Sequence, residues 1–145
     1  MTRRNPWLVA GGCLSLVAAV LHLAVIAGGP NWYRFFGAGE AMARGAERGD
    51  WTPPLVTLAI AAVLGVWAAY AFAGAGLIRR LPLMRTALLV ITAVYLLRGL
   101  LIAPVLLQPS PAPFDIWSSL IVLAYGVIHA VGTWRAWPLL QRKFA

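Results

Sequence analysis

Four long runs of apolar residues dominate the chain, and the short segments between them hold most of the charged residues. A helix of about 20 residues crosses the roughly 30 Å hydrocarbon core of a lipid bilayer. Each run has about that length, so each predicts a transmembrane helix. The four expected spans are residues 7–27, 54–78, 83–105 and 116–137.

The segments between the spans carry the residues expected where helices begin and end. Pro53 and Pro54 precede or open the second span, where a missing backbone N–H costs nothing, and Asp115 is placed to cap the fourth. The short turn 79–82 makes the second and third spans antiparallel neighbours. We therefore predict an all-α polytopic membrane protein, with residues 1–145 forming one antiparallel four-helix transmembrane bundle.

The segment 28–53 is the one sizeable connection between spans. At helical spacing its apolar residues gather on one face, and its charged residues lie elsewhere. The apolar face consists of Trp32, Phe35, Phe36, Gly39, Met42, Ala43 and Ala46. This pattern predicts an amphipathic helix at the outer membrane interface, which its internal glycines can divide into two turns.

Composition excludes a soluble globular domain. Of the 145 residues, 61% are hydrophobic and 11% are charged, against about 45–50% and about 25% in soluble domains. The net charge of +8, from 12 basic and 4 acidic residues, would suggest a nucleic-acid partner in a soluble protein. Here the charges lie between membrane spans, so they indicate topology and no nucleic-acid binding is expected.

The distribution of basic residues predicts the orientation of the chain. With the N-terminus inside, the inner segments hold Arg3, Arg4, Arg79, Arg80, Arg85, Arg135, Arg142 and Lys143. The outer segments hold three arginines and all four carboxylates. Because cytoplasmic loops are enriched in Lys and Arg, both termini are expected to be cytoplasmic.

In its number of spans and the length of its first loop, the chain resembles DoxX-type and other small bacterial inner-membrane proteins. The resemblance implies a multi-pass protein of a bacterial-type inner membrane. It includes no motif that matches residue by residue, so no functional residue is carried over from it.

Arg98 lies deep within the third predicted span, whereas the other arginines within the span bounds, Arg85 and Arg135, lie near inner span ends. A guanidinium at membrane depth costs roughly 2.5–3.5 kcal/mol on insertion scales, so it needs a partner, water or a function. One interpretation is a structural ion pair with Asp115, Glu40 or another outer carboxylate. The other is that Arg98 binds an anionic group, such as a carboxylate or phosphate, of a ligand.

Other polar residues recur along single faces of the first and fourth spans. One face of the first span carries Gly11, Ser15, Ala18 and His22, and one face of the fourth carries Ser118, Val122, Tyr125, His129 and Gly132. Hydrogen bonds between helices are one interpretation. A polar cavity or proton path, lined also by Tyr95, is the other.

No cofactor or metal site is expected. Counted from the inner ends of their spans, His22 and His129 differ in depth by roughly 10 Å, which disfavours a haem held by both. Zinc sites need three or four clustered ligands. The chain also lacks a glycine-rich phosphate loop, a GxSxG elbow, an HExxH pair and a CxxC pair.

Small residues recur at every fourth position of the second span. They are Ala61, Gly65, Ala69 and Ala73. Such a ridge allows close helix approach. Packing within the bundle is the main interpretation, and contact with a second copy or with another membrane protein is the alternative.

These features lead to a main functional hypothesis and two alternatives. The main hypothesis is a non-enzymatic protein that binds or transports a small amphipathic or anionic ligand, such as a lipid, quinone or organic acid, in an outward-facing polar pocket. Arg98 is its anion anchor, His22, Tyr95 and Tyr125 its lining, and Glu40 or Asp115 the counter-charge of the empty site. The alternatives are an accessory subunit of a membrane complex and a small enzyme that transfers protons with His22 and Glu40.

Overall fold

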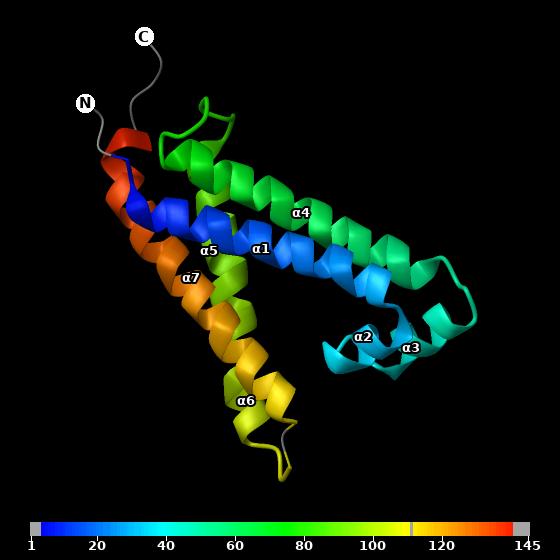
Figure 1. Ribbon diagram of the computed structural model, residues 1–145. Coiled ribbons are helices and arrows are strands. Elements are labelled where there is room, and N and C mark those ends of the chain that lie inside the picture. The colour runs from blue at the N-terminus through cyan, green and yellow to red at the C-terminus, as the bar shows by residue number, and fades with distance from the viewer. Residues whose placement is uncertain (1–3, 111, 141–145) are drawn as a thin grey trace. The chain divides into compact units, whose positions relative to one another are not determined.

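The computed structural model describes residues 4–110 and 112–140, and every regular element among them is a helix (Figure 1). The helices are α1 (Pro6–Gly28), α2 (Pro30–Phe35), α3 (Glu40–Glu47), α4 (Thr52–Gly74), α5 (Met84–Leu100), α6 (Ile102–Leu106) and α7 (Pro113–Leu140). Four segments are long and apolar enough to cross a membrane: α1, α4, α5 with α6, and α7. The four predicted spans are thereby confirmed as helices of suitable length and composition.

The ends of the second and fourth spans differ from the predicted ones. α4 stops at Gly74, earlier than the expected 78, and Gly76 then turns the chain with a φ of 78°. α7 begins at Pro113, so Asp115 lies in its first turn, and the prediction that Asp115 caps this helix is wrong. Its carboxylate is still well placed there, because the N-terminus of a helix favours negative charge.

The third span is interrupted near its C-terminal end. α5 ends at Leu100 and α6 begins at Ile102. Pro104 is the physical cause, because it has no N–H to offer the carbonyl of Leu100 and its ring crowds that carbonyl. The hydropathy of residues 83–105 predicted one continuous helix, so the break corrects that prediction.

The chain divides into two compact units. The first contains the chain up to Ser15 and from Trp67 onward, and the second contains Leu16–Val66. The boundaries fall within α1 and α4, so each of these helices contributes to both units.

In the first unit α5 and α7 pack closely through glycines. A Cβ at Gly99 would lie 2.5 Å from the Cα of Leu123, and one at Gly126 would lie 2.9 Å from the backbone nitrogen of Leu96. Gly99 of α5 meets Leu123 of α7, and Leu96, earlier on α5, meets Gly126, later on α7. The two helices therefore run antiparallel. A larger residue at either glycine would separate the backbones.

The beginning of α1 completes the core of the first unit. Leu8 is fully buried among α4, α5 and α7 and lies close to Gly74 and Gly132. Asn5 fixes this end of the helix. Its Oδ1 accepts the backbone N–H groups of Trp7 at 3.1 Å and Leu8 at 3.3 Å, and its Nδ2 donates to the carbonyl of Gly132 at 2.7 Å. One side chain therefore caps α1 and ties it to α7.

In the second unit the predicted amphipathic segment forms two short helices, α2 and α3, rather than one. Gly37 and Gly39 lie between them with φ values of 66° and 94°, which an L side chain rarely adopts. Phe36, Met42 and Ala43 of the expected apolar face do pack inward, around Val25 and Tyr33. Trp32 and Phe35 of that face are exposed instead.

Candidate functional site

A group of polar and aromatic side chains lies in the first unit, contributed by α1, α4, α5 and α7. We call it the polar cluster, and it consists of Ser15, Trp67, Tyr95, Tyr125 and His129. The Oγ of Ser15 and the hydroxyl oxygen of Tyr95 are 2.9 Å apart and share a hydrogen bond. Ser15 and His129 are fully buried, and Tyr95 is 5% exposed. The centre of the cluster is therefore part of the protein interior, while Trp67 and Tyr125 are half-buried.

Tyr95 is the centre of the polar cluster. The centroid of its ring lies 5.0 Å from that of Trp67, 5.6 Å from that of Tyr125 and 5.0 Å from that of His129. The contacts with Trp67 and Tyr125 are edge-to-face, with interplanar angles of 80° and 68°. Aromatic rings favour this geometry because the positive edge of one meets the negative face of the other.

His129 has one satisfied and one unsatisfied nitrogen. Its Nδ1 lies 2.9 Å from the carbonyl oxygen of Tyr125. Because a carbonyl can only accept, Nδ1 carries the hydrogen and Nε2 carries a lone pair. Among the described residues Nε2 has no hydrogen-bond partner, although it is buried. The ring lies against Gly11, where a Cβ would be 2.8 Å from Cε1. The cluster thus holds one unused acceptor in a closely packed surrounding.

Arg98 lies one turn beyond Tyr95, in the last turn of α5. This end of a helix favours a cation, because its carbonyls carry partial negative charge. Arg98 is exposed as a residue, and its Nη1 donates to the Oγ of buried Ser119 at 3.3 Å. No described carboxylate forms an ion pair with Arg98, and Asp115, one turn before Ser119 on α7, forms none within the described chain.

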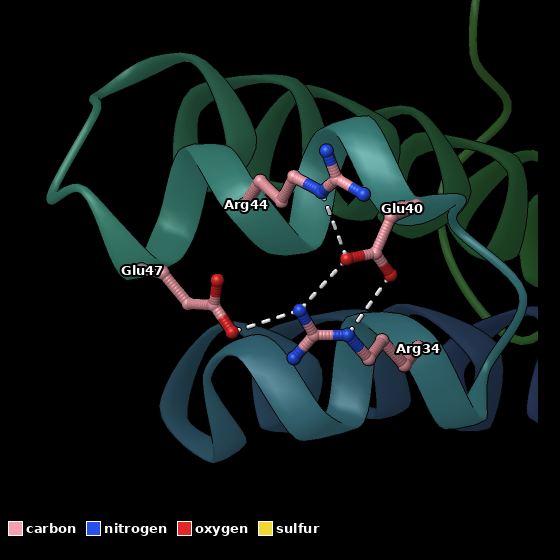
Figure 2. Close-up of polar contacts among 4 residues, drawn as sticks. All are labelled: Arg34, Glu40, Arg44 and Glu47. Atoms are coloured by element: carbon pink, nitrogen blue, oxygen red, sulfur yellow. Dashed lines mark hydrogen bonds and ion pairs between the residues drawn. The ribbon is translucent and has the colours of Figure 1, made fainter.

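Glu40 belongs to a network of charged residues in the second unit (Figure 2). Arg34 donates to both of its carboxylate oxygens at 2.9 Å, and Arg44 donates to Oε1 at 3.1 Å. Arg34 also pairs with Glu47 at 2.8 Å. The hydrogen bonds from Arg34, and then those from Arg44, lower the pKa of Glu40 to about 2. Glu40 is therefore held as a carboxylate by its neighbours in the loop.

His22 also lies in the second unit. Its Nδ1 is 2.8 Å from the carbonyl oxygen of Ala18, one turn earlier on α1. Within the described chain, no hydrogen bond joins His22 to Glu40. The structure thus brings Tyr95 and Tyr125 together and places Arg98 in the same unit, while His22 and Glu40 belong to the other.

The pocket predicted from the sequence did not include four residues that belong to the polar cluster or contact Arg98: Ser15, Trp67, Ser119 and His129. The interior faces predicted for the first and fourth spans did include Ser15 and His129, so that periodicity was the available signal. Trp67 is the one tryptophan far from every predicted span end. No sequence signal separated Ser119 from its neighbour Ser118.

The small residues of α4 differ in their surroundings. Ala61 and Ala73 are buried, whereas a Cβ at Gly65 would meet no atom within 4 Å. The ridge is also divided between the two units. Its role in contacts with a second copy or with another membrane protein stays a prediction.

Comparisons of the chain with protein-family models, with curated proteins and with solved structures give no match. The resemblance to DoxX-type proteins in span number and loop length gains no support from them. The function of the protein is therefore inferred from the residues of the chain itself.

Proposed function

We propose that this protein binds a small amphipathic ligand whose anionic group is held by Arg98. In this proposal the four apolar helices form an antiparallel bundle in a bacterial-type inner membrane, with both termini cytoplasmic and α2 and α3 at the outer interface. The observation that carries the proposal is the partner of Arg98. It is a neutral hydroxyl, that of Ser119.

A guanidinium at membrane depth is stable only if water, a partner or a bound ligand compensates for its desolvation. The alternative interpretation, a structural ion pair, needs a carboxylate. Three of the four carboxylates in the sequence, Glu40, Glu47 and Asp50, already pair with arginines of their own loop. A ligand carboxylate or phosphate would supply the missing negative charge, since both match the planar fork of arginine.

The surroundings of Arg98 suit a ligand that also has an apolar part. Val94 and Leu101 lie one turn to either side of it along the same face, and both are exposed. The tyrosine hydroxyls of the polar cluster begin one turn deeper, at Tyr95. In this proposal the ligand places its charged group at Arg98 and its apolar part against Val94, and Tyr95 and Tyr125 contribute hydrogen bonds.

Of the two carboxylates in the predicted pocket, the proposal keeps one and leaves out the other. Asp115 remains the proposed counter-charge of the empty site, because it precedes Ser119 by one turn of α7. Glu40 is left out, because its carboxylate already accepts from two guanidiniums. The same network weakens the enzymatic alternative, since a carboxylate whose pKa is about 2 is a poor general base at neutral pH.

Native mass spectrometry of the full chain purified in mild detergent tests the proposal. The wild type should carry an anionic amphiphile, and Arg98→Gln should lose it, because the substitution removes the charge and keeps much of the side-chain length. Arg98→Lys should retain part of the binding, because it preserves the charge without the fork. Arg44→Gln is the matched control, because it also removes one exposed arginine and leaves Glu40 paired with Arg34.

The proposal is wrong if Arg98→Gln retains the amphiphile at the wild-type level. It is also wrong if Arg44→Gln loses the amphiphile as fully as Arg98→Gln does, because binding would then reflect overall charge. A wild type that carries no anionic amphiphile, with an Arg98→Gln variant that no longer folds, would instead favour a structural role for Arg98.

A further inference from the structure

The contact of α1 with α7 near Gly11 is made against the ring of His129. A Cβ at Gly11 would lie 2.8 Å from Cε1, 3.0 Å from Nε2 and 3.1 Å from Nδ1 of that ring. The ring of Tyr95 on α5 also lies against it, with the two centroids 5.0 Å apart. Because His129 is fully buried, neighbouring helices enclose its imidazole.

These surroundings suit a neutral ring but not a protonated one. Nδ1 already donates to the carbonyl oxygen of Tyr125, and Nε2 has no hydrogen-bond partner among the described residues. An oxygen close enough to accept from a protonated Nε2 would already be a partner of that nitrogen. A second proton on the ring would therefore create a buried charged N–H group with no acceptor in the described chain. Such a group costs far more free energy than a neutral group that lacks a partner.

The four helices around the ring bring no carboxylate close to it. α1 and α4 contain no Asp, Glu, Lys or Arg. The charged residues of α5 are Arg85 and Arg98, and those of α7 are Asp115 and Arg135. Asp115 is the one acidic residue among them, and it precedes His129 by 14 residues, which is about 21 Å along the helix. A positive charge on the ring would therefore lack a balancing negative charge from these helices.

The other titratable groups of these helices do not supply that charge. Tyr95 and Tyr125 belong to the polar cluster, and phenol hydroxyls ordinarily titrate near pH 10. Tyr70 of α4 donates to the carbonyl of Pro82, and Cys13 of α1 is exposed. Within the polar cluster, the imidazole is thus the one group whose charge ordinarily changes between about pH 5 and 8.

We propose that His129 is a pH-sensitive switch in the contact between α1 and α7. With the ring neutral, α1 packs on α7 through Gly11 and the polar cluster is closed. With a proton on Nε2, α1 moves away from α7 near Gly11, so that water reaches the charged N–H. The contact between α5 and α7 is retained, because Gly99 and Gly126 bring those backbones together without the ring. Acid therefore opens the polar cluster on the side of α1, and this switch requires no ligand at Arg98.

The direction and size of the pH effect depend on where the proton can bind. The closed state has no acceptor for the second N–H group. The open state exposes an imidazole, which takes up a proton at about pH 6.5 as it does in an unfolded chain. Because opening takes up one proton, its equilibrium constant should rise about tenfold for each pH unit below about 6.5.

Hydrogen exchange of the full chain in mild detergent, measured by mass spectrometry at about pH 7.5 and about pH 5, tests this switch. Rates are expressed as protection factors, which remove the intrinsic effect of pH on amide exchange. In the wild type, protection around Gly11 in α1 should fall at least about tenfold at the lower pH. Protection around Gly99 and Gly126 should stay within about twofold. Glu40 does not contribute, because its pKa of about 2 keeps it ionised at both pH values.

Two variants remove the titratable ring. In His129→Leu and in His129→Met, the protection of α1 at the two pH values should agree within about twofold, because neither side chain takes up a proton. Methionine adapts to irregular spaces in a protein core. It therefore keeps the switch testable if the leucine variant does not fold.

His22→Leu is the matched control. His22 is the other histidine of the chain, and its Nδ1 also bonds to a carbonyl one turn earlier, that of Ala18 at 2.8 Å. It is only half-buried, so its replacement should leave the acid response of the wild type unchanged.

Four results would overturn the switch. The first is a wild type that keeps its α1 protection at the lower pH, and the second is a folded His129 variant that shows the wild-type loss. The third is abolition of that loss in His22→Leu. The fourth is a fall in the protection of α5 and α7 together with that of α1, because acid would then unfold the whole unit.

Discussion

The Nδ1 of His129 donates to the carbonyl oxygen of Tyr125 at 2.9 Å, and this leaves the Nε2 of the same ring buried without a partner in the described chain. A buried acceptor that makes no hydrogen bond usually costs about 1–3 kcal/mol. The residue is fully buried, so neighbouring helices and not lipid surround it. The polar cluster therefore includes one group whose presence packing alone does not explain.

The first prediction concerns this nitrogen. His129→Leu removes the unsatisfied acceptor and replaces the imidazole with an apolar side chain of similar size. The unfolding free energy should change by less than about 1.5 kcal/mol. The variant loses the hydrogen bond to Tyr125, but it also loses the free-energy cost of burying Nε2 without a partner. Denaturant unfolding of the purified protein in mixed micelles measures this. A loss well above that value would show that Nε2 has a partner in the folded protein, such as an ordered water.

The second prediction concerns the hydrogen bond between Ser15 and Tyr95. Ser15→Ala or Tyr95→Phe alone should destabilise the protein, because each leaves the other hydroxyl buried without its partner. In the double variant the two effects should be less than additive, with a coupling energy of about 0.6–1.7 kcal/mol. Unfolding curves of the four proteins give this coupling directly. Fully additive effects would contradict a direct hydrogen bond.

The third prediction concerns the close approach of α5 and α7. Gly99→Ala should destabilise the protein by about 1–3 kcal/mol, because the new Cβ would lie 2.5 Å from the Cα of Leu123 and the backbones would have to separate. Gly65→Ala is the control, because its Cβ would meet no atom within 4 Å. It should be neutral or slightly stabilising, since alanine favours a helix over glycine. Equal melting temperatures for the two variants would contradict the packing described here.

The fourth prediction concerns pH. The pKa of Glu40 in the folded protein is about 2, below its ordinary value of 4.5. The folded state therefore holds this proton less tightly than the unfolded state, and the contribution of Glu40 to stability is present above pH 4.5. That contribution should be lost as the pH falls from about 4.5 to about 2.

Hydrogen exchange of the α2–α3 segment across this pH range measures the effect. Glu40→Gln should remove most of the pH dependence between pH 4.5 and 2, whereas Asp50→Asn, which breaks the separate pair with Arg48, should not. High salt should reduce the difference between wild type and Glu40→Gln, because the network is exposed and screened. A Glu40→Gln variant with the pH profile of the wild type would contradict the network in Figure 2.

The apolar runs of the sequence were sufficient to predict the number of spans and their approximate bounds. Length and hydropathy decide whether a helix can cross a membrane, and both are properties of the sequence. The ends of the helices were less predictable. Pro104 stands in the sequence as a known helix breaker, but whether it ends, kinks or is tolerated in a helix depends on what surrounds it.

Which side chains contact each other could be determined only from the tertiary structure. The helical period placed Ser15, Tyr125 and His129 on interior faces, yet only the packing of α1, α5 and α7 joins Ser15 to Tyr95 and closes Gly11 over His129. The same holds for Arg98, for which the sequence offered Asp115 and Glu40 as partners and the structure shows Ser119. Periodicity gives the direction in which a side chain points around its own helix. The neighbour that it meets depends on the depth and rotation of another helix, which are determined by packing at residues such as Gly99 and Gly126.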